Sequence, residues 1–464
     1  MKYLYVFLAF FFLMHTLTAQ TVWETQDIKL RYGIKGMYYD SVSEKSYIHG
    51  FVPLYIDESG DTTNIVIYDG VNFSAMSDCP VWDIRAMVRY KDKLFAGGGG
   101  LSSLASWNGT VWEVIEHEGL LFNLRVIDDR LYAVGNFEQI AGVPCRGIAV
   151  WNDTTWAAYK GLDSILEVSE ALNDILYYKG KPYVCGNFFN PDYPELKDLM
   201  MYEEELGWQP VGDFTIGGLG GLEQMLVWRD TLYIAGLMGE SSGAPGNCVA
   251  AWDGENWHRL QNGVGRPDEG SSAVREMTIY NNELWATGHF DHINGWILSE
   301  DQGSVAKWDG TRWCGVDFRR TGNSGGFGMW KDELFVVGEF FMADDTSAWR
   351  IAKWVGGDYT DTCVQDLTTA VESIDAAGLM FDVYPNPTNG EFTLTFQNDG
   401  IIRNGMVMTI QILDTYGRVV LSEKREVASG ANAISLNAVN LSSGIYYLTS
   451  SLRDTLLFSK ITKL

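Results

Sequence analysis

The sequence lacks the features of several protein classes. Its 464 residues include only 6 histidines, 11 prolines and 6 cysteines, and no two cysteines have the CxxC spacing of a zinc knuckle or a redox motif. Basic residues are scarce, since 34 Lys and Arg oppose 60 Asp and Glu and the net charge is −26. Such an acidic chain repels phosphate backbones and anionic lipids, which argues against nucleic-acid and peripheral membrane binding. Beyond residues 3–14 there is no long apolar run, so no transmembrane segment is predicted.

The first 19 residues have the organisation of a signal peptide. Lys2 precedes an apolar run over residues 3–14, and small and polar residues follow up to Ala19. The run is too short to remain as a membrane helix, and it holds no cysteine that could accept a lipid. We therefore expect removal of residues 1–19, and export of a chain that begins near Gln20.

A short motif recurs seven times between residues 20 and 359. Its most regular copy is Val305-Ala306-Lys307-Trp308-Asp309-Gly310-Thr311-Arg312-Trp313. The other six copies lie at 67–73, 105–112, 150–156, 201–208, 251–257 and 353–359. Asp-Gly and Asn-Gly are typical of two-residue hairpin turns in which both central residues have positive φ. Each copy therefore predicts a strand, a tight turn and a second strand.

The residues upstream of each copy predict a second hairpin. A strand leads to a polar two-residue turn, and an alternating strand then ends at glycine, as in residues 280–288 and 127–135. Two hairpins at a period of about 50 residues give the four strands of a propeller blade, with a spacing closer to kelch than to WD40 repeats. The predicted fold class is all-β, a seven-bladed β-propeller over residues 20–359.

Tertiary packing of such a ring can also be anticipated. The repeated Trp107, Trp151, Trp252, Trp308 and Trp354 are expected to fill the gaps between blades. The strand Thr21–Glu24 copies the last strand of a blade but has no blade before it, so we expect it to close the ring by pairing with the final repeat. Cys79 and Cys363 follow the first and last repeats, and ring closure makes them a candidate disulfide.

The tryptophan hairpin and the glycine-ended strand together resemble the kelch-like propellers of the cortical cell-polarity-marker type. The best match runs from Gly135-Asn136-Phe137 to Ile148-Ala149-Val150-Trp151, and the resemblance covers most of residues 21–359. The turn dipeptide is lost at Tyr202-Glu203-Glu204-Glu205. The resemblance implies a fold but hardly any activity.

Residues 360–379 are small, polar and without pattern, which indicates a linker, and residues 380–464 alternate as the strands of a small immunoglobulin-like β-sandwich. This tail resembles the type A C-terminal sorting domain of the type IX secretion system. The resemblance implies passage of the outer membrane with the type IX machinery as partner, and secretion or display on a Gram-negative cell surface. The residues that carry it are Pro385, Asn386, Pro387, Gly390, Gly417, Gly444, Tyr446, Lys460 and Lys463.

Signals for chemistry are weak. Among the histidines only His289 and His292 cluster, and no third metal ligand is visible beside them. We expect no cofactor, no metal and no catalytic residue. The favoured function is an exported binding or adhesion module for a protein or a glycan. The alternative is a glycan lyase or hydrolase with acidic residues at the mouth of the propeller, and a structural coat component is a third hypothesis.

Overall fold

The protein is described by a computed structural model that divides into two compact units, Met1–Asp361 and Thr362–Leu464. The described residues are 22–31, 33–51, 54–56, 62–76, 79–100, 103–167, 170–212, 221–239, 243–265, 272–290, 292–293, 296–297, 304–316, 318, 322–340, 342–343, 346–347, 350–356, 380–386, 388–398, 406–413, 419–427, 430–452 and 455–463. The predicted signal peptide and the predicted linker lie outside them.

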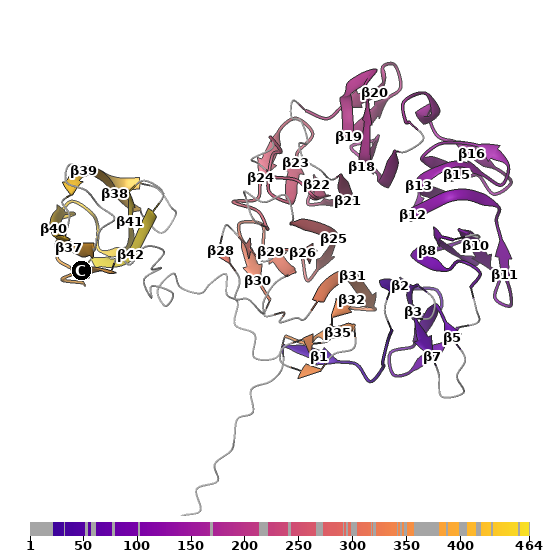
Figure 1. Ribbon diagram of the computed structural model, residues 1–464, viewed down its shortest axis with the longest axis horizontal. Helices are drawn as coiled ribbons and strands as arrows, with labels where there is room; N and C mark the ends of the chain where they lie inside the picture. Colours follow the sequence, from indigo (N-terminus) through magenta and orange to yellow (C-terminus); the bar gives the residue numbers. More distant parts are fainter. Residues whose placement is uncertain are drawn as a thin grey trace, which may run out of the picture. The chain divides into compact units, whose positions relative to one another are not determined.

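The described part of the first unit contains seven antiparallel sheets of four main strands each. The first strands of the sheets lie innermost, and each contacts the first strand of the next sheet, the last one contacting the first (Figure 1). They are β2 (Ile34–Asp40), β8 (Asp83–Tyr90), β12 (His117–Ile127), β17 (Ala171–Tyr178), β21 (Leu222–Trp228), β25 (Ala273–Tyr280) and β31 (Gly322–Trp330). The second strands are β3 (Lys45–Gly50), β9 (Lys93–Gly99), β13 (Arg130–Ile140), β18 (Lys181–Asn190), β22 (Thr231–Gly236), β26 (Glu283–His289) and β32 (Glu333–Phe340).

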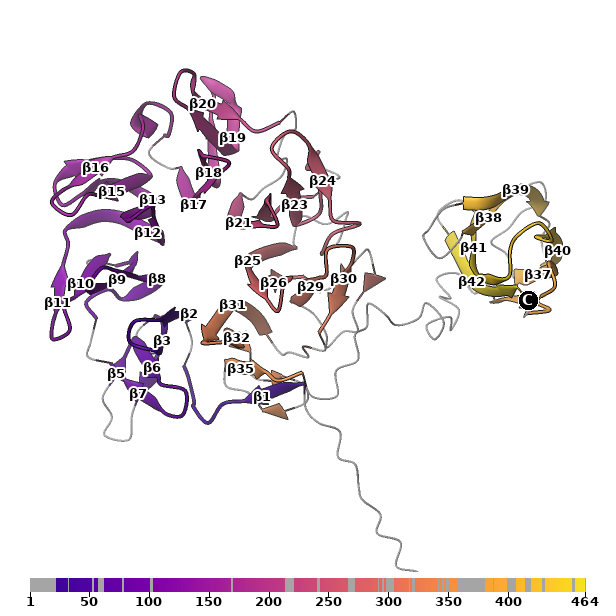
Figure 2. The same cartoon turned by 180° about the vertical axis from the view of Figure 1, so that it is seen from behind.

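The outer half of each sheet is the tryptophan hairpin. The third strands are β6 (Ile65–Tyr68), β10 (Leu104–Trp107), β15 (Ile148–Trp151), β19 (Tyr193–Glu203), β23 (Val249–Trp252), β29 (Val305–Trp308) and β35 (Ile351–Trp354). The outermost strands are β7 (Phe73–Ala75), β11 (Trp112–Val114), β16 (Trp156–Ala158), β20 (Gly207–Pro210), β24 (Trp257–Arg259), β30 (Trp313–Gly315) and β1 (Trp23–Thr25). Figure 2 shows the same order from behind.

Short elements decorate the connections between these strands. They are β4 (Tyr55–Ile56) with β5 (Thr62–Thr63), β14 (Val143–Pro144), the 3-10 turn η1 (Leu162–Ser164), β27 (His292–Ile293) with β28 (Trp296–Ile297), and β33 (Met342–Ala343) with β34 (Thr346–Ser347). Among the residues that the structure describes, no helix is long and apolar enough to cross a membrane.

The predicted closing strand is confirmed. β1 pairs antiparallel with β35, and Trp23 stands opposite Trp354 as Trp313 stands opposite Trp308 in the preceding sheet. The amides of Val355 and Gly356 also donate to the carbonyl of Val22. The final sheet thus takes its outer strand from the start of the chain, which covers an edge that would otherwise have unpaired amides and carbonyls.

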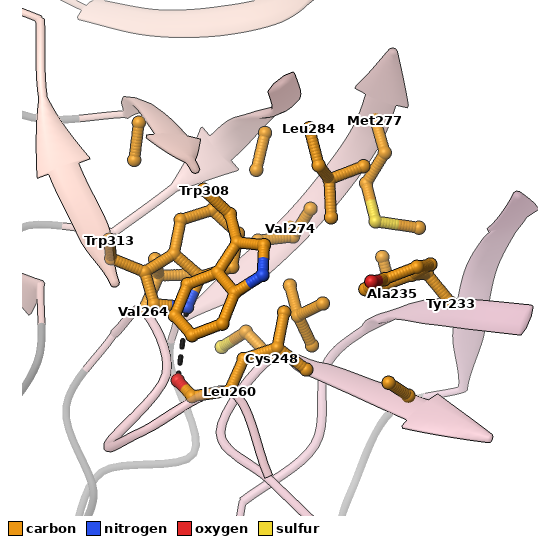
Figure 3. Close-up of a cluster of buried hydrophobic side chains, with 14 of the residues drawn as sticks. Tyr233, Ala235, Cys248, Leu260, Val264, Val274, Met277, Leu284, Trp308 and Trp313 are labelled. Carbon is orange, nitrogen blue, oxygen red and sulfur yellow. Dashed lines mark hydrogen bonds between the residues drawn. The ribbon is translucent and has the colours of Figure 1, made fainter. Parts of the chain in front are cut away.

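The hydrophobic cores lie between neighbouring sheets. In the cluster of Figure 3, Tyr233 on β22 and Trp308 on β29 belong to one core between two neighbouring sheets. At the equivalent positions elsewhere the rings are in contact: the centroids of Trp285 and Trp354 lie 5.0 Å apart, and those of Phe335 in the last sheet and Tyr68 in the first lie 5.6 Å apart. The predicted role of the tryptophans as fillers between sheets is therefore correct. A buried ring of this size stabilises by about 1.5–3 kcal/mol.

The second aromatic residue of the hairpin ties one sheet to the previous one. The indole N–H groups of Trp208, Trp257 and Trp313 donate to backbone carbonyls three or four residues past the second tryptophan of the preceding hairpin, at 3.0, 3.2 and 3.1 Å. Trp23 does the same to the carbonyl of Val316 at 3.0 Å. The dashed line in Figure 3 marks the bond from Trp313 to Leu260. Each of these indoles is thus both packed and satisfied in its hydrogen bonding.

The predicted turn type of the tryptophan hairpin is wrong. Trp308 and Trp313 are opposed, so four residues form the loop, and only its second residue, Gly310, has a positive φ, of 109°. The first residue, Asp309, instead accepts hydrogen bonds from the amides of Thr311 and Arg312 through Oδ1, at 2.6 and 2.9 Å. The Asp or Asn of this motif is therefore selected for its side-chain acceptor and not for its backbone conformation.

The two-residue turns with paired positive φ occur in the other hairpin. Asp128 and Asp129 have φ values of 47° and 57°, and Asn281 and Asn282 have 50° and 60°. Both pairs join the first strand of a sheet directly to the second, with Ile127 opposite Arg130 and Tyr280 opposite Glu283. These pairs are the turns that match the twist of the flanking strands.

The C-terminal unit consists of two sheets with a common core. One has the order β36 (Met380–Tyr384), β37 (Glu391–Asn398), β40 (Gly430–Asn437), and the other β39 (Val419–Val427), β38 (Met406–Leu413), β41 (Gly444–Leu452), β42 (Thr455–Lys463). Leu394 and Leu436 of the first sheet pack with Ile410 and Leu448 of the second.

The candidate disulfide between Cys79 and Cys363 is wrong. Cys79 is a buried thiol, as are Cys145, Cys185 and Cys248, whereas Cys314 is disulfide-bonded. Cys363 lies outside the described residues. Cys79 packs in the core between the first and second sheets, in one cluster with Val81 and Ile84. The seam at which the chain closes is elsewhere, beside β1, so the position of Cys79 in the first repeat gave no guide to its bonding.

Candidate functional site

The predicted sorting residues gather where β42 ends. The side-chain carbonyl of Asn386 accepts a hydrogen bond from the amide of Thr462 at 2.8 Å. The amide of Thr388 donates to the carbonyl of Thr462 at 2.8 Å, and Lys463 Nζ donates to the carbonyl of Asn389 at 3.3 Å. The proline-rich turn is thus fixed to the last strand, although more than 70 residues separate them in sequence.

Gly390 is required at its position by its backbone. Its φ is 118°, and a Cβ there would lie 2.6 Å from Cα of Val439. Its carbonyl accepts the amide of Ala438 at 2.6 Å, and its amide donates to Thr388 Oγ1 at 3.0 Å. The turn that follows the proline motif therefore packs backbone against backbone, which only glycine permits.

Gly444 and Tyr446 belong to the strand next to β42. Gly444 stands opposite Lys463, Tyr446 opposite Ile461, and Lys460 opposite Tyr447. Tyr446 is buried, and its hydroxyl donates to the carbonyl of Ser442 at 2.9 Å.

These contacts leave a small exposed surface beside the last strand. Tyr384 is 55% exposed, Pro385 and Asn386 are also exposed, and the Tyr384–Pro385 peptide bond is cis. Pro387 and Gly417 lie outside the described residues. The structure thus brings together Asn386, Gly390, Gly444 and Lys463 from three separate motifs.

A second constellation lines the centre of the first unit and was missed by the sequence analysis. Every one of the seven innermost strands has a bulge at the same register. The unpaired residues at the bulges are Lys35, Arg85, Phe122, Asn173, Glu223, Arg275 and Gly325. The sequence did contain a signal for the bulge. Apolar residues that face the same side of a regular strand are two positions apart, but near the start of these strands they are three positions apart, as in Leu222-Glu223-Gln224-Met225.

The bulges explain the glycine that recurs in each second strand, although β13, β18 and β32 continue past it and the predicted strand end is wrong there. Leu121, just before its bulge, stands opposite Gly135, and a Cβ on Gly135 would lie 2.0 Å from the carbonyl oxygen of Leu120. The corresponding separations at Gly98 and Gly288 are 1.8 and 2.2 Å. The inner strand turns its backbone against this position, so the glycine is needed for space and not for a positive φ.

Polar side chains after the bulges join adjacent inner strands. Asp174 is fully buried, accepts two hydrogen bonds from Arg125, at 2.8 and 2.6 Å, and accepts the amide of Met225 at 2.9 Å. Gln224 accepts the amide of Met277 at 2.5 Å in the same way. Such charge-assisted, bidentate contacts are strong, and they fix the spacing of the inner strands.

Glu276 holds the equivalent place on β25. Burial of the carboxyl away from water raises the pKa of Glu276 to about 7, although the residue as a whole keeps some exposure. A hydrogen bond from the Phe327 amide and the charge of Arg125 act in the opposite direction. A Cβ on Gly326 would lie 2.2 Å from Glu276 Oε2, so the neighbouring strand leaves space for this carboxyl. A carboxyl with such a pKa can exchange a proton near neutral pH.

Exposed aromatic residues lie at one end of the inner strands. Phe51 is 48% exposed and Trp82 is 56% exposed, and their backbones are adjacent because Phe51 pairs with Asp83. The guanidinium of Arg85 lies 5.0 Å from the ring centroid of Phe122, and Arg85 Nε donates to Asp83 at 3.0 Å. Exposed rings beside cationic groups are typical of binding surfaces.

The histidine pair makes no metal site that the described residues reveal. His289 is exposed at the end of β26 and His292 begins β27, while Asp291 between them lies outside the described residues. Within the described ranges, no group of three or more His, Cys, Asp or Glu residues is placed to hold a metal ion.

The tail geometry agrees with a comparison to known families. Residues 382–463 match the secretion system C-terminal sorting domain. The match confirms the expected export of this protein across the outer membrane, to the cell surface or the medium. It covers the two sheets of the C-terminal unit and leaves the first unit outside its range.

Comparison with curated proteins finds no match. Among solved structures, the chain is similar to two crystal structures of one extracellular domain from B. thetaiotaomicron, described as a putative one component system and a putative hybrid two component system. The identities are 10% and 11%, the matches cover 93% of this chain and 75% and 74% of the others, and the TM-scores are 0.18 and 0.19. At these scores the likeness carries no conclusion.

Proposed function

We propose that the protein is an exported binding module in which residues 20–359 form a seven-bladed, kelch-like β-propeller and residues 380–464 form an immunoglobulin-like sorting domain. The propeller is supported by the closing strand β1 and by the equivalent intersheet contacts around the ring. The proposed ligand is a protein or a glycan. Its binding is supported by the exposed Phe51 and Trp82 and by the Arg85–Phe122 pair beside them.

The observation that carries the export role is the family match over residues 382–463. The test is to express a chain truncated after Gly378 in a bacterium with a type IX system and to measure surface and periplasmic protein with antibodies. We expect the truncated chain to stay in the periplasm. The single substitution Lys463→Ala, which removes the contact to the carbonyl of Asn389, should weaken export while leaving the tail folded. Surface display of the truncated chain would refute this role of the tail.

The alternative function is a glycan lyase or hydrolase, and one observation favours it. Glu276 faces the inner strands with a pKa of about 7, which suits a general acid or base, and Arg125 lies near enough to influence it. Against this, Asp174 is committed to Arg125 and Asp83 to Arg85. Assays of polysaccharide cleavage with the wild type and with Glu276→Gln distinguish the two functions, because an enzyme of this kind would lose its activity in the variant.

A further inference from the structure

A groove of about 890 Å³ opens between the second and third sheets, away from the inner strands. Aromatic side chains form its walls, namely Tyr90 and Phe95 from the second sheet and Trp151 and Trp156 from the third. Ser106 lies between these walls, and Glu113 lies at the opening. Trp151 is half-buried, as are the equivalent Trp107 and Trp354, whereas Trp252 and Trp308 are buried.

A small side chain helps to keep the groove open. Ser106 stands opposite Phe95, at a position where five of the other six sheets carry a larger residue. Those five are Ile67, Val150, Met201, Lys307 and Lys353, and Ala251 is the other small one. Space is therefore left in front of Trp151 that a side chain such as that of Met201 would occupy.

Two hydrogen-bonding groups inside the groove have no protein partner among the described residues. Ser106 is 3% exposed, and its hydroxyl makes no hydrogen bond to another described residue. Trp156 is also 3% exposed, and its indole N–H has no acceptor in that part of the chain, although Trp208, Trp257 and Trp313 all donate to a backbone carbonyl. Neither atom is among the fully buried side-chain atoms of the described residues that lack a partner, which include Trp252 Nε1 and Trp285 Nε1. Ser106 Oγ and Trp156 Nε1 are therefore accessible from the groove to a ligand or to water.

Acidic side chains outnumber basic ones around the groove. Lys93 Nζ donates to Glu113 at 2.9 Å, and Lys91 pairs with Asp153, which also accepts the hydroxyl of Tyr90 at 2.7 Å. Asp92 and Glu116 line the groove as well, so four carboxylates face two lysines there. With this local excess and a net charge of −26 on the chain, an anionic ligand is disfavoured. A neutral molecule suits this lining when it has an apolar face for the rings and several hydroxyl groups for the donors and the carboxylates.

We propose that this groove binds a neutral glycan, with one sugar ring against Trp151 and its hydroxyl groups hydrogen-bonded to Ser106 Oγ and Trp156 Nε1. A sugar ring has an apolar C–H face and a polar edge, which matches the walls and the two donors together. An aromatic peptide side chain would use the walls but leave both donors unpaired. The proposal rests on the proposed binding function and names its ligand class and its place.

The test measures binding of neutral tetrasaccharides of glucose, galactose, mannose and N-acetylglucosamine to the full chain by titration calorimetry. Ser106→Met fills the groove with the side chain that the fourth sheet carries at this register, so the fold should persist. We expect affinity for at least one of the four to fall at least about tenfold in this variant, and about fivefold in Ser106→Ala through loss of one hydrogen bond. Ser164→Met, at an exposed serine on η1, is the matched control and should bind as the wild type does.

Three outcomes would overturn the proposal. Unchanged glycan affinity in Ser106→Met, with loss of affinity in Trp82→Ala, would place the ligand at the inner strands and keep the proposed binding function. A groove that in the same titrations takes an aromatic peptide and no sugar would exclude the glycan. Absence of binding to all four tetrasaccharides at millimolar concentration would also reject it, and the truncation experiment on export would be unaffected.

Discussion

Adjacent glycines on β9 allow a direct test of the bulge that recurs in all seven inner strands. A Cβ on Gly98 would lie 1.8 Å from the carbonyl oxygen of Asp83, whereas a Cβ on Gly97 would meet only the methyl groups of Leu121 and Leu124, at 3.2 Å. The first obstacle is backbone and cannot rotate away. The second is the end of two flexible side chains. Neither glycine has a positive φ, so conformational strain is matched in the pair.

The expected magnitudes follow from these distances. Alanine in place of glycine in a strand gains about 0.5–1 kcal/mol when nothing obstructs it, because the unfolded chain loses freedom. An overpacked core costs about 1–3 kcal/mol and more where backbone must move. We therefore expect Gly97→Ala to lie near the wild type, and Gly98→Ala to lower the free energy of unfolding by at least about 2 kcal/mol relative to Gly97→Ala.

The assay is urea unfolding followed by tryptophan fluorescence. All 17 tryptophans precede residue 360, so the signal reports the first unit alone. Folding of Gly97→Ala together with failure of Gly98→Ala to fold would also support the reasoning. Equal stability of the two variants would refute it, because the close approach of the inner strand would then not be what requires glycine.

Three further predictions use the same first unit. Trp313→Phe loses the bond to the carbonyl of Leu260 and should cost about 1–2 kcal/mol in urea unfolding, whereas Trp313→Ala should cost about 3–5 kcal/mol. Asp309→Ala should cost about 1 kcal/mol, and Asp309→Asn little, since Asn108 accepts the same two amides in its own loop; thermal unfolding measures both. Burial raises the pKa of Glu276 in the folded state to about 7 from 4.5, so the free energy of unfolding should fall as pH rises between these values and stay constant above them. Glu276→Gln should remove this fall, which is checked by measuring the free energy of unfolding from about pH 4 to 8.

Local patterns were enough to predict the hairpins, the closing strand and the tail. The alternation of apolar residues, the polar turns and the repeat length are properties of short segments, and each hairpin has to bury its apolar face against a neighbour. The strand around Trp23 could be assigned to the last sheet because its sequence copies the outer strand of another repeat. The sorting domain could be recognised because its motifs are short and follow one another in a fixed order.

Other features depended on the packing of distant segments. Asp309 and Gly310 form the preferred dipeptide of a two-residue turn, yet the opposition of Trp308 and Trp313 requires four residues in the loop. The state of Cys79 depends on what lies beside it, which no spacing along the chain records.

The sequence by itself determined how many hairpins there are, which strand completes the last sheet and that the protein is exported, because all three follow from local patterns. Only the tertiary structure decided that the inner strands bulge in register, that Asp174 joins Arg125 to the amide of Met225, and that Ser106 leaves a groove before Trp151. These features arise where neighbouring sheets meet, and their energies depend on space and on hydrogen-bond partners about 50 residues apart.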